Sequence, residues 1–113
     1  MDFALNEEQL ELQEMVRDFV AKEITPNVSE MDKNNEATPG LMKKAADMGL
    51  LNVVVPEEFG GPGLDSVTIA MIYEELGKGC AGVATSMAAN SLATAPVLLA
   101  GTEEQKKIYC DLL

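Results

Sequence analysis

Two pairs of adjacent carboxylates, Glu57-Glu58 and Glu74-Glu75, are the side chains of this sequence best suited to move a proton. Carboxylates serve as general bases or acids, and two carboxylates that share one proton can fill both roles. Adjacent residues do not face each other on a helix, so neither pair forms such a dyad. The sequence therefore predicts that all four are solvated surface charges, and it assigns no catalytic residue.

Cys80 is a candidate nucleophile because it stands at a predicted helix start, a position that suits a reactive cysteine. The sequence holds no histidine, so no Cys-His or Ser-His pair and no ordinary zinc-enzyme site can form. The second cysteine, Cys110, is far away in the chain and no C-x-x-C motif occurs. We predict two reduced, buried thiols and no metal site.

A third candidate, the loop Gly60-Gly61-Pro62-Gly63, has the glycine content of a phosphate-binding loop. It lacks the lysine of a Walker loop and the long strand that precedes a dinucleotide-binding loop. Pro62 also removes one backbone amide that could bind phosphate. The sequence therefore predicts a structural turn.

Composition narrows the function classes further. The chain has 113 residues with 8 cations against 19 acids, a net charge of −11, and 47% hydrophobic residues. These values fit one globular domain over 1–113 and exclude a basic nucleic-acid surface. The start, Met1-Asp2-Phe3, has no basic residues before an apolar run, so no secretory signal is expected and the cytoplasm is the predicted location.

Helical patterns dominate the first half of the chain. Asn6 and Gln9 form a capping-box pattern, and an apolar stripe runs from there to Ile24, before Pro26 ends or kinks the helix. A short turn of helix is expected beyond it. Thr38-Pro39 predicts the next helix start, and Gly49-Leu50 a Schellman-type end. The apolar run 51–55 has no partner strand, so we predict a buried extended segment.

The second half predicts three more helices. The first starts at Asp65 or Ser66 and ends near Gly77, with a turn at 78–79; the second is free of charge, runs over about 81–95 and bends at Pro96; the third opens with a Thr102–Gln105 capping box. The fold class is therefore all-α, an up-and-down bundle of about five to six helices. The last helix stops at 112–113 without a cap, so the chain is expected to continue into a longer protein.

The stretch 79–102 carries no charge and is long enough to cross a bilayer. Its polar residues and its high alanine content favour a helix buried in protein over a membrane span. Ala84, Ala88 and Leu92 are spaced four apart and share one face of it. Small side chains there indicate either tight helix packing or the wall of an apolar cavity that admits an acyl chain.

Several motifs together resemble the N-terminal helical domain of the acyl-CoA dehydrogenase family, most closely its medium-chain-type and related bacterial members. The most specific is Pro-Glu-Glu-Phe-Gly-Gly-Pro-Gly-Leu-Asp over 56–65. The others, collinear along the chain, are Leu-Asn-Glu-Glu-Gln over 5–9, Phe19 to Pro26, Gly49-Leu50 with Val53 to Val55, Glu-Glu-Leu over 74–76, Gly82-Val83, Asn-Ser-Leu over 90–92, and Gly-Thr-Glu-Glu-Gln-Lys-Lys over 101–107.

The resemblance implies a flavoprotein oxidoreductase of fatty acid metabolism. Full-length members use FAD to oxidise an acyl-CoA to the 2-enoyl-CoA and pass electrons to an electron-transfer flavoprotein, commonly as homotetramers. The catalytic glutamate lies in a C-terminal helical domain, and most flavin contacts come from that domain and a middle β domain. The present chain would therefore be inactive alone, without bound FAD, and none of its residues is assigned to catalysis or to the cofactor.

One family role does carry over. The resemblance implies that Ala84, Ala88 and Leu92 form one wall of the acyl pocket. Medium-chain members have a glutamine and a glutamate where this chain has Ala84 and Ala88. Two alanines leave a deeper or wider space, so we expect a long or bulky acyl group.

Two alternatives remain open at this point. A standalone helical module could bind partner helices through its alanine face. A family relative with different flavin chemistry, such as an acyl-CoA oxidase or a flavin monooxygenase, would share the same N-terminal domain.

Overall fold

The computed structural model describes residues 3–113. The expectation that no secretory signal begins at Met1 and Asp2 falls on residues outside this range. No strand occurs among residues 3–113, and the all-α prediction is confirmed. The α-helices are α1 (Glu7–Phe19), α2 (Val28–Asn34), α3 (Leu41–Asp47), α4 (Ser66–Gly79), α5 (Ala81–Ala100) and α6 (Glu103–Cys110).

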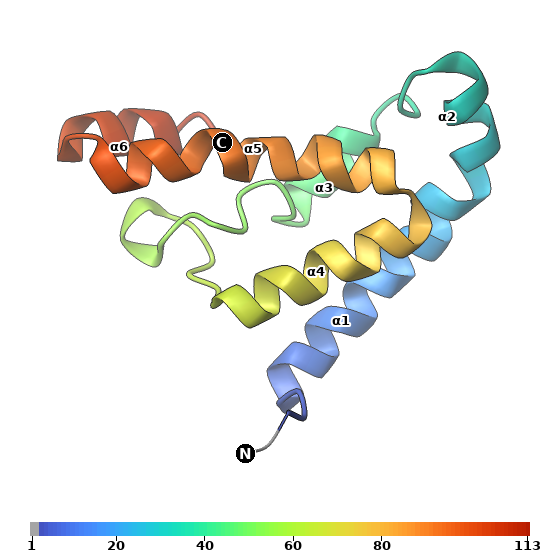
Figure 1. Ribbon diagram of the computed structural model, residues 1–113, viewed down its shortest axis with the longest axis horizontal. Coiled ribbons are helices and arrows are strands. Elements are labelled where there is room, and N and C mark those ends of the chain that lie inside the picture. The colour runs from blue at the N-terminus through green and yellow to red at the C-terminus, as the bar shows by residue number, and fades with distance from the viewer. Residues whose placement is uncertain (1–2) are drawn as a thin grey trace.

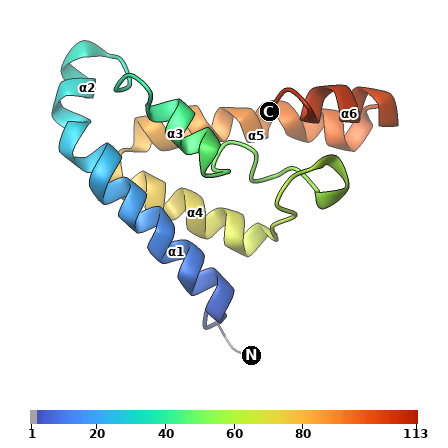
Figure 2. The same ribbon diagram turned by 180° about the vertical axis from the view of Figure 1, so that it is seen from behind.

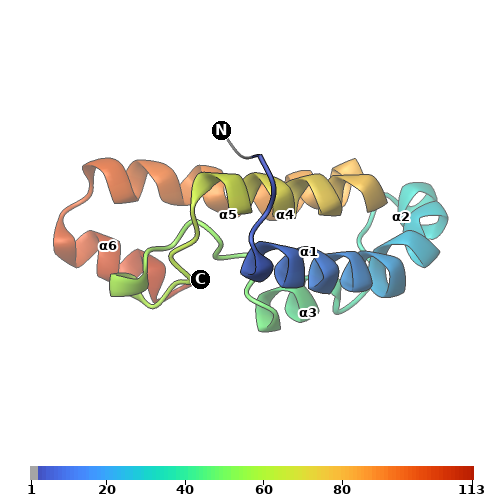
Figure 3. The ribbon, with the colours of Figure 1, turned by 90° about the horizontal axis from the view of Figure 1, so that it is seen from below.

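The helices form a flat molecule of 43 × 39 × 20 Å. Helices α1 and α4 pack against each other, α5 returns along α4, and α6 folds back on the end of α5 (Figure 1). The long loop between α3 and α4 is seen best from behind (Figure 2). Figure 3 shows α4 and α5 in one layer, with α1 and α3 beneath them. The largest fully buried side chains are Ile24, Leu41, Leu50, Ile72, Leu76 and Met87.

Both predicted capping boxes are confirmed. The Asn6 side chain accepts a hydrogen bond of 2.8 Å from the Gln9 amide, whose side chain accepts one of 3.0 Å from the Asn6 amide. Thr102 and Gln105 repeat this arrangement at the start of α6. Each box satisfies backbone donors that a helix start otherwise leaves unpaired, so the sequence alone located both helix starts.

The end of the first helix differs from a simple break at Pro26. The chain leaves α1 through a π-helical turn, Val20–Ile24, and a 3₁₀ turn, Thr25–Asn27, before α2 begins. Pro26 stands in the first positions of the 3₁₀ turn, where no backbone donor is needed. Gly79 packs across this turn, since a Cβ there would lie 2.5 Å from Cγ1 of Val20. A bulkier residue would separate the first helix from the end of α4.

Helix α3 starts later than the sequence predicts. Thr38-Pro39 is not its cap; it opens a turn closed by a 3.0 Å hydrogen bond from the Leu41 amide to the Thr38 carbonyl. Gly40 has a left-handed φ of 81°, which delays the helix to Leu41. The other end is a confirmed Schellman stop, because the amides of Gly49 and Leu50 each bond a helix carbonyl at 2.9 Å.

The structure differs from the sequence prediction in three further segments. The segment 51–55 is buried at Val53 and Val55 but contains a turn and is not fully extended. Helix α4 ends at Gly79, beyond the expected Gly77, so 78–79 are helical and the chain turns at Cys80. Helix α5 continues past Pro96 to Ala100, although proline there removes the donor to the Leu92 carbonyl.

Candidate functional site

Ala84, Ala88 and Leu92 lie along one side of α5, as their spacing predicts. Their exposure rises along the helix: Ala84 is buried, Ala88 is partly buried and Leu92 is 74% exposed. The three residues thus form a strip that runs from the core to the surface and is open along its outer side. Their assignment to a pocket wall stays a prediction.

The strip continues into an exposed apolar face. Leu99 is 86% exposed, and Ala89, Ala93 and Pro96 between it and the strip are also exposed. The expectation that α5 is surrounded by protein is therefore wrong for residues 3–113, where its only buried side chains are Val83, Ala84, Met87 and Thr94. Helix α4 covers one side of α5 and α6 covers its far end, which leaves the remaining side open.

Three hydroxyl side chains of α5 are bonded within the helix. The hydroxyl groups of Thr85, Ser86 and Thr94 donate to the carbonyls four residues earlier, at 2.8, 2.9 and 2.6 Å. These bonds remove the need for an outside partner and keep the helix surface effectively apolar. By length and composition alone, Ala81–Ala100 is the one helix in the described part of the chain that could cross a membrane.

A single side-chain hydrogen bond links α4 to this side of α5. The hydroxyl oxygens of Tyr73 and Ser91 are 2.6 Å apart, and both residues are partly buried. Buried tyrosine hydroxyls require such a partner. The bond joins Tyr73 to the side of α5 that carries the strip, a contact that the sequence did not predict.

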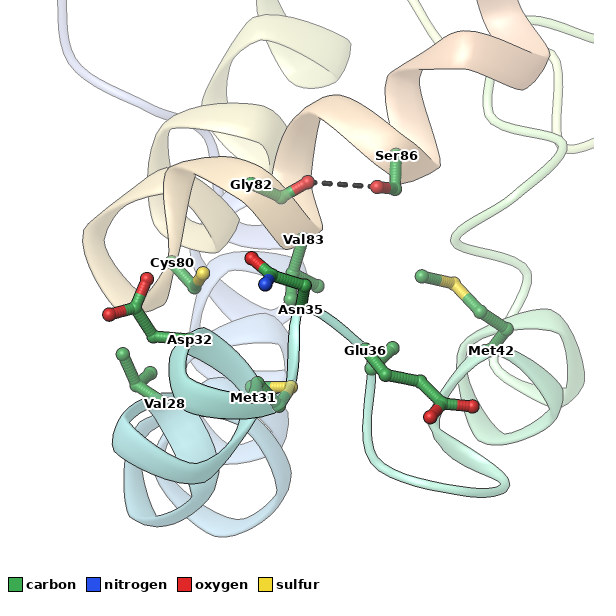
Figure 4. A pocket seen from close by; sticks show the side chains of 11 residues that line it. Val28, Met31, Asp32, Asn35, Glu36, Met42, Cys80, Gly82, Val83 and Ser86 are labelled. Carbon is green, nitrogen blue, oxygen red and sulfur yellow. Dashed lines mark hydrogen bonds between the residues drawn. The ribbon is translucent and has the colours of Figure 1, made fainter.

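A separate cavity of about 290 Å³ lies between α2, α3 and the start of α5 (Figure 4). Met31, Met42 and Cys80 contribute sulfur atoms to its lining, and Asp32 and Glu36 contribute carboxylates. None of the three predicted wall residues lines it. Cys80 is a free thiol that is only partly buried, so the prediction that both thiols are buried is wrong for this residue. Among residues 3–113 no group of three histidine, cysteine or carboxylate side chains could hold a metal.

The glycine-rich loop is a tightly packed turn, as predicted. The amides of Gly61 and Gly63 donate to the carbonyls of Pro56 and Val55, at 3.0 and 3.2 Å. A Cβ at Gly61 would lie 2.1 Å from the Val55 carbonyl oxygen. These amides are already used and cannot bind the phosphates of a nucleotide, so the described residues do not fit a flavin site in this loop.

Glu75 is not the solvated charge that the sequence predicts, because it is only 3% exposed. Its carboxylate accepts two hydrogen bonds of 3.0 Å from Arg17 and further bonds of 2.9 Å from Gln13 and Lys78. The Arg17 bonds, opposed by burial, hold the pKa of the Glu75 carboxyl below its usual value. Through its bonds to Gln13 and Arg17, Glu75 joins α4 to α1. Because both of its carboxylate oxygens already accept hydrogen bonds, it is not placed to act as a base. Its neighbour Glu74 is exposed, as predicted.

The sequence of this chain matches the family described as "Acyl-CoA dehydrogenase, N-terminal domain" over residues 6–113. It is 41% identical over 110 residues to "Probable acyl-CoA dehydrogenase YngJ" of Bacillus subtilis (strain 168), covering 96% of this chain and 29% of that protein. It is 38% identical over 113 residues to "Probable medium-chain specific acyl-CoA dehydrogenase 2, mitochondrial" of Caenorhabditis briggsae, covering 100% of this chain and 28% of that protein.

Solved structures agree with these sequence matches. Butyryl-CoA dehydrogenase from Megasphaera elsdenii superimposes with a TM-score of 0.85 at 32% identity, over 97% of this chain and 30% of that chain. A chain from a structural study of the electron transferring flavoprotein of Acidaminococcus fermentans superimposes with a TM-score of 0.89 at 37% identity. The match covers 97% of this chain and 29% of that chain. The chain thus spans less than a third of the length of each of these relatives.

Proposed function

The chain belongs to the acyl-CoA dehydrogenase family as its N-terminal domain, and we propose that α5 supplies one wall of the acyl pocket in a full-length acyl-CoA dehydrogenase. The observation that carries the proposal is the open strip of Ala84, Ala88 and Leu92 on a helix whose outer side is uncovered. An acyl chain needs an apolar surface, and the strip offers one because its three side chains carry no polar atom.

The small side chains of the strip favour a long or bulky acyl group. Alanine at 84 and 88 leaves space that larger residues would fill, and each additional buried methylene of a substrate contributes about 0.8 kcal/mol to binding. Leu92 supplies apolar contact at the outer end of the strip. The relative from Syntrophus aciditrophicus (strain SB), "Cyclohex-1-ene-1-carbonyl-CoA dehydrogenase", is 40% identical over 105 residues, which supports a wall of this kind beside a bulky acyl group.

The redox chemistry of the proposed enzyme belongs to FAD bound elsewhere in the full-length protein. When bound in the full-length protein, FAD would supply the hydride-accepting chemistry, and the partner for the electrons would be an electron-transfer flavoprotein. The strip on α5 would position the acyl chain and exclude water from one side of it. We further propose that the full-length protein is a homotetramer and that residues 1–113 alone are inactive.

Activity of the full-length protein tests this proposal. Purified full-length protein should be yellow and should oxidise acyl-CoA thioesters with an artificial electron acceptor, whereas residues 1–113 alone should be colourless and inactive. Full-length protein that oxidises no acyl-CoA of any chain length would contradict the proposed activity. Flavin bound by the isolated chain would contradict the claim that the cofactor site lies outside it.

A further inference from the structure

Tyr73 of α4 is bonded to the side of α5 that carries the strip formed by Ala84, Ala88 and Leu92. Its hydroxyl oxygen is 2.6 Å from that of Ser91 on α5. Ser91 follows Ala84 by seven residues and Ala88 by three, a spacing that places all three on one side of an α-helix. Because α4 packs along α5, this hydrogen bond brings the Tyr73 hydroxyl to the side of α5 that carries the alanines.

The alanines provide space on this side of α5 but no large side chain to bound it. Tyr73 is a large side chain that α4 brings to this side of α5, and it is only partly buried. Its hydroxyl is anchored on Ser91, which limits the rotation of the ring. We propose that Tyr73 is a specificity-determining residue whose ring bounds the acyl space beside Ala88; this rests on the proposed function of α5.

The hydrogen bond between the two hydroxyls indicates which part of Tyr73 determines acyl specificity. The two hydroxyls share one hydrogen bond, which lowers the polarity that they present to an apolar chain. The bulk of the ring sets the boundary, and the hydroxyl only holds the ring in place. Phenylalanine should therefore replace Tyr73 with little change in specificity, whereas a small residue should not.

Ratios of kcat/KM for palmitoyl-CoA over octanoyl-CoA, measured on the full-length protein, test the inference. Tyr73→Ala should raise this ratio about tenfold, because the space left by the ring would let the longer substrate bury about two more methylene groups. Ser91→Ala and Tyr73→Phe each break the hydrogen bond but keep the ring, so both should keep the ratio within about twofold of the parent. Ser86→Ala is the matched control, because Ser86 is exposed away from the strip and bonds only its own helix.

The outcomes separate this inference from the proposed function. An unchanged ratio in folded, active Tyr73→Ala would overturn the role of Tyr73 and leave the proposed function intact. A parent protein that oxidises neither thioester would overturn the proposed function, and this inference with it. If thermal unfolding shows that Tyr73→Ala is not folded, Tyr73→Leu replaces it, with a smaller rise expected and an unchanged ratio again overturning the role.

Discussion

Arg17 of α1 and Glu75 of α4 are joined by two hydrogen bonds of 3.0 Å, from Nε to Oε2 and from Nη2 to Oε1. The guanidinium is 56% exposed and the carboxylate 3% exposed. A buried carboxylate is stable only when its oxygens are bonded, and the two parallel bonds achieve this. The pair therefore fixes how α1 lies against α4, the helix on which α5 packs.

Replacing the buried carboxylate should destabilise the chain. Glu75→Gln removes the charge that Arg17, Gln13 and Lys78 share, and we expect a loss of about 2 kcal/mol in the free energy of unfolding. Urea unfolding followed by circular dichroism measures it. Glu74→Gln is the control, since Glu74 is exposed and its loss should change stability by less than about 0.5 kcal/mol. Equal effects of the two variants would show that burial of Glu75 contributes nothing.

The same carboxylate makes stability depend on pH. The hydrogen bonds from Arg17 lower the pKa of Glu75 in the folded chain below its ordinary value of 4.5. The contribution of Glu75 is therefore fully present above pH 4.5 and is lost as the pH falls through the lower folded pKa. The difference in unfolding free energy between the parent and Glu75→Gln should be largest near neutral pH and shrink in acid. A difference that grows in acid would contradict this sign.

The glycine-rich turn should tolerate no side chain at Gly61. A Cβ there would lie 2.1 Å from the Val55 carbonyl oxygen, so Gly61→Ala should cost at least about 2 kcal/mol in the free energy of unfolding. Gly77→Ala in α4 is the matched control, because nothing lies within 4 Å of a Cβ there. It should stabilise the helix by about 0.5–1 kcal/mol. Thermal melts of both variants test the contrast, and a neutral Gly61→Ala would refute the packing.

The capping boxes, the Schellman stop and the glycine-rich turn were all predictable from sequence, because each depends on residues within a few positions of one another. The π-helical turn over 20–24 was not, since it forms where the first helix meets Gly79 of another helix. Burial of Glu75 likewise depends on Arg17, far away in the chain. The spacing of Ala84, Ala88 and Leu92 correctly predicted a shared face. Their unequal exposure depends on how much of α5 its neighbours cover.

The open side of α5 should cause the 113-residue chain to self-associate. An apolar groove of about 490 Å³ lies between α5 and α6, and Leu99 of α5 is also exposed. Its apolar lining includes Pro96, Val97, Ala100, Ile108, Tyr109 and Leu112. Uncovered apolar surface of this kind drives association, which the net charge of −11 opposes less as salt rises.

Sedimentation velocity over a concentration series measures this association. Leu99→Glu should weaken it by placing a charge on the exposed face, and added salt should strengthen it in the parent chain. Leu10→Glu is the control, because Leu10 is 50% exposed on α1 rather than on α5. A parent chain that remains monomeric at high concentration and high salt would contradict the prediction.

The most direct test of the central claim, that α5 forms a wall of the acyl pocket, is the chain-length profile of full-length Ala88→Glu. A glutamate at this partly buried position would extend across the strip towards the acyl space. We expect kcat/KM for palmitoyl-CoA to fall at least about tenfold relative to octanoyl-CoA, since the longest chain loses the most buried surface. A profile that matches the parent in a folded, flavin-loaded variant would show that α5 does not contact the acyl chain.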